Sequence, residues 1–218
     1  MKAILFDLDG TLFQTEKVAV PAFLDTFQWL ITEGLYDGEI PDERKIESAF
    51  GLTHDEIWDL LLPNCDEDVR ARADQIMLQA ELERFDRDLG VLYPGVGELL
   101  HHLYQKKLPL FIASNGSPDY VYAALKSKKL VSLFTGIYTA GGYQTKEKVD
   151  LVKIAMTEHG ITDGYMVGDR NSDIKAGKEN GLITVGCRYT GFSLFGEAHE
   201  LDHADHIINH PNELLSLL

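Results

Sequence analysis

Cysteine is scarce in this sequence, and long apolar runs are missing. The 218 residues include two cysteines, Cys65 and Cys187, which lie far apart and outside any C-x-x-C pair. This pattern suggests neither a disulfide framework nor a structural zinc site. No segment approaches the roughly 18 consecutive apolar residues of a membrane helix, so we expect no membrane partner.

Basic residues are also few relative to acidic ones. Twenty lysines and arginines stand against 35 aspartates and glutamates, which gives a formal net charge of −15. A surface this negative repels the phosphates of nucleic acids, so we expect no nucleic-acid partner. Asp7 and Asp9 interrupt the apolar N-terminal residues before the core of a signal peptide could form. We therefore expect a cytoplasmic protein that acts on something small.

The first part of the chain changes from strand to helix. The apolar run over residues 1–7 is too short for a helix and predicts a buried strand, which ends in the turn signal Asp9-Gly10-Thr11. From residue 15 to about residue 88, apolar residues recur only at helical spacing, and no strand is predicted. The predicted helices cover residues 15–34, 41–50, 55–62 and 69–80.

After residue 95, strands and helices alternate. Strands are predicted at residues 109–113, 136–139, 165–167, 183–186 and 204–209, separated by helices at 96–107, 119–128, 148–159 and 172–180, with a further helix at the C-terminus. Such alternation is typical of a doubly wound parallel sheet covered by helices on both faces. We predict an α/β core formed by residues 1–14 and 89–218, interrupted by an all-helical insertion at residues 15–88.

Polar side chains follow successive strands of the predicted core. In a parallel sheet the active site is expected beyond the carboxyl ends of the strands, where these side chains would meet. Each pair alone is more often a solvated loop or a helix cap, but their coincidence at four strand ends favours a function. The residues are Asp7 and Asp9, Ser114 and Asn115, Lys146 and Lys148, and Asp169 and Asp173.

The chemistry of this set is coherent. Carboxylates that share one cleft repel each other unless a cation lies among them, and oxygen ligands favour a hard divalent ion such as Mg²⁺. A carboxylate can also attack phosphorus and form an aspartyl-phosphate. Hydroxyls, backbone amides and a lysine would then neutralise the charge on the phosphoryl oxygens. The residues thus favour phosphoryl transfer from a small phosphorylated metabolite.

Four motifs resemble those of the haloacid dehalogenase-like hydrolases. They are the segments Asp7-Leu8-Asp9-Gly10-Thr11 and Ser114-Asn115-Gly116, a downstream lysine, and Gly168-Asp169-Arg170-Asn171-Ser172-Asp173. The resemblance covers nearly the whole chain, because the order and spacing of the motifs agree. The helical insertion also falls where this family places its cap domain. Within the family, the chain resembles the phosphatase branch with a helical cap after the first strand, to which the phosphoglycolate phosphatases and β-phosphoglucomutases belong.

The resemblance implies a role for each carboxylate. Asp7 would be the nucleophile and would also contact the metal. Asp9 would protonate the leaving oxygen and then deprotonate the attacking water, while its backbone carbonyl helps to hold Mg²⁺. Asp169 would be a direct metal ligand, and Asp173 would support the ion directly or through water.

The phosphoryl group has its own expected set of contacts. The resemblance implies that it would be held by Ser114, Asn115 and Gly116, together with Gly10 and Thr11. One lysine would pair with Asp7 and the phosphoryl oxygens. Lys148 is favoured because a helix start holds a charge firmly, and Lys146, in the glycine-rich segment before that helix, is the alternative.

The second aspartate of the first motif separates activities within the family. Dehalogenases lack an acid at that position, so Asp9 favours a Mg²⁺-dependent phosphatase. A phosphotransferase of the β-phosphoglucomutase type and a non-enzymatic regulator that binds a phosphoryl ligand are the alternatives. Arg170 departs from the small hydroxyl residue that many relatives carry there. Within the cap, we expect a specificity loop at residues 50–54, where Gly51 permits a tight turn.

Overall fold

The computed structural model describes residues 1–50, 52, 54–189 and 199–218, and the chain forms two compact units. Unit 1 comprises Met1–Gln14 and Val91–Leu218, and unit 2 comprises Thr15–Gly90. The loop expected at residues 50–54 includes Gly51 and Thr53, which lie outside the described residues.

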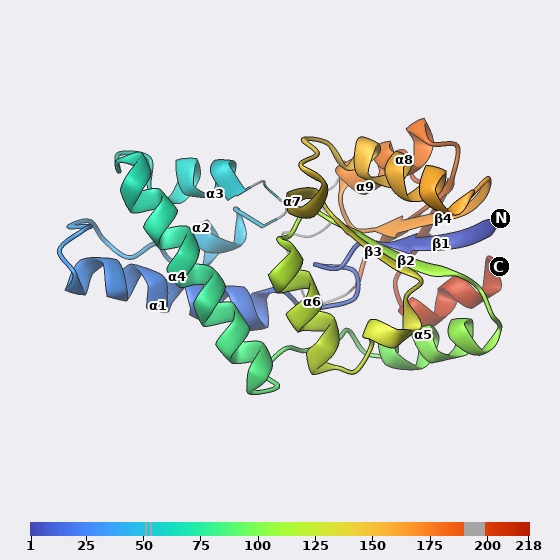
Figure 1. The fold of residues 1–218 in the computed structure, drawn as a ribbon, viewed down its shortest axis with the longest axis horizontal. Helices are drawn as coiled ribbons and strands as arrows, with labels where there is room; N and C mark the ends of the chain where they lie inside the picture. Colours follow the sequence, from blue (N-terminus) through green and yellow to red (C-terminus); the bar gives the residue numbers. More distant parts are fainter. Residues whose placement is uncertain (51, 53, 190–198) are drawn as a thin grey trace. The chain divides into compact units, whose positions relative to one another are not determined.

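Unit 1 is built on a parallel sheet of six strands in the order β3-β2-β1-β4-β5-β6 (Figure 1). The central strand β1 pairs with β2 on one side and with β4 on the other, so the chain reverses its winding direction there. This order confirms the predicted doubly wound α/β fold. The strands are β1 (Lys2–Phe6), β2 (Leu110–Ser114), β3 (Gly136–Thr139), β4 (Asp163–Gly168), β5 (Ile183–Cys187) and β6 (His206–Ile208).

Helices cover both faces of this sheet. In Figure 1, α8 and α9 lie above the strands, whereas α5 and the C-terminal η2 lie below them. The C-terminal element was predicted as a helix and is the 3₁₀ helix η2, which begins at Pro211. The elements are α5 (Val96–Gln105), α6 (Pro118–Ser127), η1 (Val131–Leu133), α7 (Ala140–Tyr143), α8 (Lys148–His159), α9 (Asn171–Glu179) and η2 (Pro211–Ser216).

The glycine-rich segment before α8 differs from the prediction. The sequence predicts no helix between residues 139 and 148, but residues Ala140–Tyr143 form the single helical turn α7. The hydroxyl of Thr139 accepts a hydrogen bond from the amide of Gly142 at 3.1 Å and so caps this turn. A cap of this kind satisfies an amide that a helix start leaves unpaired, which allows even a short glycine-containing turn to form.

The strands of unit 1 are packed into a hydrophobic core, which supports the polar residues at their ends. Ala3, Leu5 and Phe111 pack with Leu151 and Val152 of α8 in one buried cluster. Successive side chains of a strand point to opposite faces, so the equally buried residues between them cover the other side. Continuous burial of this kind is typical of parallel strands that are covered on both faces.

Helices are the only regular elements among the described residues of unit 2, and turns and irregular segments connect them. Within the unit, the rings of Phe23 and Trp58 pack edge to face with their centroids 5.5 Å apart. The Nε1 of Trp58 donates a hydrogen bond to Oδ1 of Asp74 at 2.9 Å. The aromatic side chains therefore stabilise the unit from within. No helix in the described part of the chain is long and apolar enough to cross a membrane. The helices are α1 (Glu16–Thr32), α2 (Glu43–Glu47), α3 (His54–Leu61) and α4 (Glu67–Asp86).

Candidate active site

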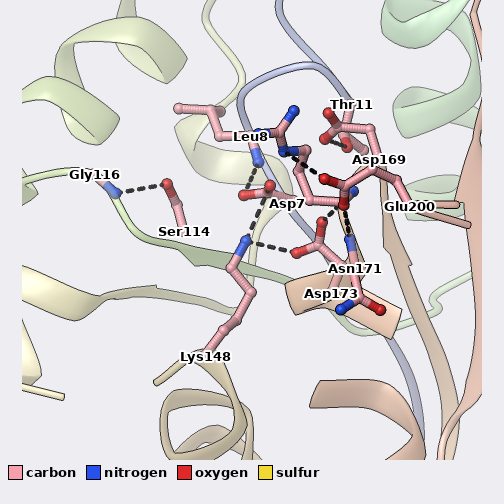
Figure 2. A network of polar contacts seen from close by, with 11 residues as sticks. Asp7, Leu8, Thr11, Ser114, Gly116, Lys148, Asp169, Asn171, Asp173 and Glu200 are labelled. Carbon is pink, nitrogen blue, oxygen red and sulfur yellow. Dashed lines mark hydrogen bonds and ion pairs between the residues drawn. The ribbon is translucent and has the colours of Figure 1, made fainter. Parts of the chain in front are cut away.

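Asp7 follows directly after the central strand β1 and is buried. Its backbone amide donates to the carbonyl of Val167 on the neighbouring strand β4 at 2.9 Å. The amide of Leu8 donates to Oδ1 of Asp7 at 2.8 Å, which orients the carboxylate (Figure 2). The backbone of two central strands and one local hydrogen bond thus fix the position of this side chain.

Two further carboxylates come from the end of β4 and the start of α9. Asp169 is fully buried, and its Oδ1 accepts a hydrogen bond from the hydroxyl of Thr11 at 3.0 Å. Asp173 is also fully buried, and its Oδ2 accepts from the amide of Arg170 at 3.0 Å, a helix-capping contact. Within the described part of the chain, Oδ2 of Asp169 has no hydrogen-bond partner.

The turn after β1 approaches Asp169 closely. The amide of Gly10 donates to the carbonyl of Phe13 at 3.0 Å, and Gly10 has a φ of +72°. A Cβ atom at this position would lie 2.3 Å from Oδ2 of Asp169, well inside van der Waals contact. The turn therefore requires glycine both for its backbone conformation and for the space beside the carboxylate.

Lys148 enters the cluster from the first residue of α8. Its Nζ lies 3.0 Å from Oδ2 of Asp7 and 2.6 Å from Oδ1 of Asp173, and 2% of its side chain is exposed. Figure 2 shows the ammonium group pointing between the two carboxylates. Lys146, the alternative cation, is exposed to solvent two residues earlier.

The electrostatics of the cluster are unbalanced. Asp7, Asp169 and Asp173 each offer a carboxylate oxygen, and these three oxygens lie within 4.8 Å of one another. Burial and the charge of Asp173 raise the pKa of Asp7 to about 7, although Lys148 acts to lower it. Burial, followed by the charges of Asp7 and Asp173, also raises the pKa of Asp169 well above its ordinary value. One ammonium group does not compensate three buried carboxylates.

Burial disfavours the charged form of Lys148, but the carboxylates of Asp173 and Asp7 outweigh burial and raise the pKa of this lysine. Lys148 therefore stays protonated at neutral pH. The remaining negative charge and the all-oxygen donors fit a hard divalent cation, as does the Oδ2 of Asp169, which has no hydrogen-bond partner among the described residues. The three carboxylates are the residues that can hold such an ion.

The residues after β2 form a separate polar loop of the same unit. Ser114 is buried at the end of the strand, and its hydroxyl accepts a hydrogen bond from the amide of Gly116 at 3.1 Å (Figure 2). Asn115 and Gly116 are half-buried. Backbone amides and a hydroxyl at a strand end are groups that can hold phosphoryl oxygens.

Two residues near these motifs were not singled out from the sequence. The hydroxyl of Tyr120 donates to Oδ1 of Asp9 at 2.6 Å. Glu200 accepts from the amide of Asn171 at 2.5 Å, and its other carboxylate oxygen lies 3.9 Å from Nε of Arg170. Arg170, the departure from the family motif, thus faces an acidic side chain. Both contacts join segments distant in sequence, so no local pattern reveals them.

Known proteins resemble the chain over almost its full length. A phosphoglycolate phosphatase from Escherichia coli (strain K12) is 26% identical over 243 aligned residues, which cover 100% of this chain and 92% of that protein. A solved haloacid dehalogenase-like hydrolase from Streptococcus pneumoniae superposes with a TM-score of 0.80 at 25% identity, covering 100% of this chain and 98% of the other.

A second solved structure shares the fold. CbbY from Rhodobacter sphaeroides, in complex with phosphate, has a TM-score of 0.82 at 22% identity. The superposition covers 98% of this chain and 96% of the CbbY chain. The sequence model of the haloacid dehalogenase-like hydrolases matches residues 4–187, which include all four motifs. The resemblance stated from the sequence is confirmed, and the chain belongs to the haloacid dehalogenase-like hydrolase family.

Proposed function

We propose that the protein is a Mg²⁺-dependent phosphatase that hydrolyses a small phosphorylated metabolite through an aspartyl-phosphate on Asp7. The observation that carries this proposal is the buried group of Asp7, Asp169, Asp173 and Lys148 at the carboxyl ends of β1 and β4. Membership of the hydrolase family and the similarity to phosphoglycolate phosphatase support it.

In the first step, a carboxylate oxygen of Asp7 attacks phosphorus. The bond between phosphorus and the substrate's ester oxygen breaks, and Asp9 gives its proton to that oxygen. Asp7 must be ionised for this attack. Because the pKa of Asp7 is raised to about 7 without a metal ion, a bound cation favours the reactive form.

In the second step, water attacks the phosphorus of the aspartyl-phosphate. Asp9, now a carboxylate, takes a proton from this water, and the bond between phosphorus and Asp7 breaks. Phosphate leaves, and both aspartates return to their starting protonation states. Mg²⁺, when bound by Asp7, Asp169, Asp173 and the backbone carbonyl of Asp9, supplies positive charge that stabilises the phosphoryl oxygens.

Other groups of the chain would neutralise and orient the phosphoryl group. Lys148 is assigned as the cation in place of Lys146, because its ammonium group already contacts Asp7. Ser114 and the amide of Asn115 would donate hydrogen bonds to the phosphoryl oxygens. Gly10, Thr11 and Gly116 would line the same site, since the amides of Gly10 and Gly116 and the hydroxyl of Thr11 already donate within the chain. Residues 15–88 would act as the cap that selects the substrate.

The proposal is tested by phosphate release from a panel of phosphorylated metabolites, with Mg²⁺ and after treatment with a chelator. We expect release from at least one member, 2-phosphoglycolate being the first choice, and loss of release without the metal. Release from no member would favour a binding protein. A hexose phosphate belongs in the panel, since isomerisation in place of hydrolysis would indicate a phosphotransferase.

The assignment of Asp9 has a separate test. A general acid matters most when the leaving oxygen is a poor leaving group. Asp9→Asn should therefore slow hydrolysis of alkyl phosphates far more than hydrolysis of p-nitrophenyl phosphate. Equal losses on both substrates would argue against a role for Asp9 in proton transfer.

A further inference from the structure

Tyr120 is a buried side chain that touches the proposed acid and base. It lies in the first turn of α6 and is 8% exposed. Its hydroxyl donates to Oδ1 of Asp9 at 2.6 Å, across 111 positions of sequence. The contact therefore joins the first motif to the helix that follows the second motif.

The loop after β2 holds Tyr120 in place. The side chain of Ser117 caps α6 by accepting a hydrogen bond from the amide of Tyr120 at 3.3 Å. A Cβ at Gly116 would lie 3.1 Å from Cδ1 of Tyr120 and 3.3 Å from Oγ of Ser114. The absence of a side chain at Gly116 thus lets the ring pack against the loop that carries Ser114.

We infer that Tyr120 is a positioning residue that fixes the orientation of the Asp9 carboxyl group while Asp9 transfers protons. This inference rests on the proposed function, in which Asp9 is the acid and base. A carboxyl group turns about its terminal torsion easily, and a misdirected acid transfers its proton slowly. A short hydrogen bond from a packed aromatic side chain restricts that rotation.

The chemistry of a phenol suits this role. Asp9 must alternate between the protonated and the ionised form in the two steps of the reaction. A phenolic hydroxyl can donate to Oδ1 in both forms, because the carbonyl oxygen of a carboxylic acid also accepts hydrogen bonds. Tyr120 would thus hold Asp9 throughout the cycle without adding charge to the site.

The test compares Tyr120→Phe with Tyr122→Phe. Tyr122 lies on the same helix but is 51% exposed, so its variant controls for loss of a hydroxyl. With Tyr120→Phe, we expect kcat on an alkyl phosphate to fall about tenfold with KM nearly unchanged, because part of the contribution of acid catalysis is lost. The kcat on p-nitrophenyl phosphate should fall less than about twofold, because its leaving group needs little protonation.

The ratio of the two kcat values, measured on one preparation, is independent of the fraction of protein that is folded. A merely structural role for Tyr120 would lower both kcat values equally and leave this ratio unchanged. Melting curves of both variants, recorded alongside, set an assay temperature at which each protein is folded. A ratio that stays at the wild-type value would overturn the inference.

A double variant separates this inference from the proposed function. If Tyr120 acts through Asp9, adding Tyr120→Phe to Asp9→Asn should cause no further loss of activity on the alkyl phosphate. A further loss would overturn the inference. Absence of phosphate release by the wild-type protein, or equal losses on both substrates in Asp9→Asn, would instead refute the proposed function.

Discussion

At two sites of unit 1 a lysine contacts an aspartate, and the pKa of the aspartate is shifted in opposite directions at the two sites. In the candidate active site, Lys148 contacts the buried carboxylate of Asp7. At the edge of the sheet, Lys178 of α9 pairs with Asp205, which precedes β6 and is partly exposed. Asp205 also accepts hydrogen bonds from the amide and the hydroxyl of Thr184 on β5, at 2.8 and 2.9 Å.

The pKa values of the two aspartates move in opposite directions. Burial, and then the charge of Asp173, raise the pKa of Asp7 to about 7. The hydrogen bond from Lys178, followed by the backbone of Thr184, lowers the pKa of Asp205 to about 2. Solvation and the number of neighbouring donors, rather than the residue types, therefore decide whether such a pair stabilises the fold. A buried pair with surplus negative charge is typical of a site that binds a cation.

The largest effect should follow from removing the nucleophile. Asp7→Asn preserves volume but cannot form an aspartyl-phosphate, so turnover should fall by at least about a thousandfold. The matched substitution at the other site, Asp205→Asn, should leave turnover within about twofold, because Asp205 takes no part in the reaction. Phosphate release measures both. Activity of Asp7→Asn within tenfold of the wild type would refute the mechanism.

The next effect concerns the two candidate lysines. Lys148→Met removes the ammonium group from the buried cluster, and kcat/KM should fall by about two orders of magnitude. Lys146→Met changes an exposed side chain and should have little effect. Steady-state kinetics on one substrate compares the variants directly. The reverse order would identify Lys146 as the active-site cation.

A smaller effect is expected from removing one negative charge from the three buried carboxylates of the candidate active site. Burial and like charges disfavour the ionised form of Asp169, so a neutral side chain should stabilise the metal-free protein at neutral pH. Metal-free Asp169→Asn should melt about 3 °C above the metal-free wild type, as expected for a gain near 1 kcal/mol.

Mg²⁺ should raise the melting temperature of the wild type but not that of the Asp169→Asn variant, because only the wild type retains the full set of ligands. Thermal melts with and without the ion test both expectations. A variant that melts lower without metal, or that responds to Mg²⁺ as the wild type does, would contradict the proposed metal site.

The smallest effect belongs to the sheet-edge pair. Asp205→Ala should lower the free energy of unfolding at pH 7 by about 1 kcal/mol, a modest figure because solvent screens the pair. The pKa of Asp205 in the folded protein is about 2, below its ordinary value of 3.8. Its contribution is therefore complete above the ordinary pKa and is lost as the pH falls toward 2.

Urea unfolding of the wild type and of Asp205→Ala between pH 7 and pH 3 measures this difference. The difference between the two free energies should become smaller toward pH 3, because Asp205 begins to lose its charge there. A gap between them that is independent of pH would show that the carboxylate charge of Asp205 is not what stabilises the edge of the sheet.

Features that depend on local sequence were predicted well. The apolar run before Asp7 predicts β1, and the helical pattern after Lys148 predicts α8. These two elements were enough to place both residues at one edge of the predicted sheet. The contact of Tyr120 with Asp9 depends on the direction in which α6 leaves the sheet, which no periodicity encodes. The pairing of Arg170 with Glu200 likewise arises only from folding.

The backbone hydrogen bond from Asp7 to Val167 has a consequence for hydrogen exchange. This amide lies between the two central strands of the sheet, the part of a domain that opens only with global unfolding. Its proton should therefore exchange among the slowest in unit 1. Fraying of the outer strand β6 should therefore leave the backbone position of Asp7 unchanged.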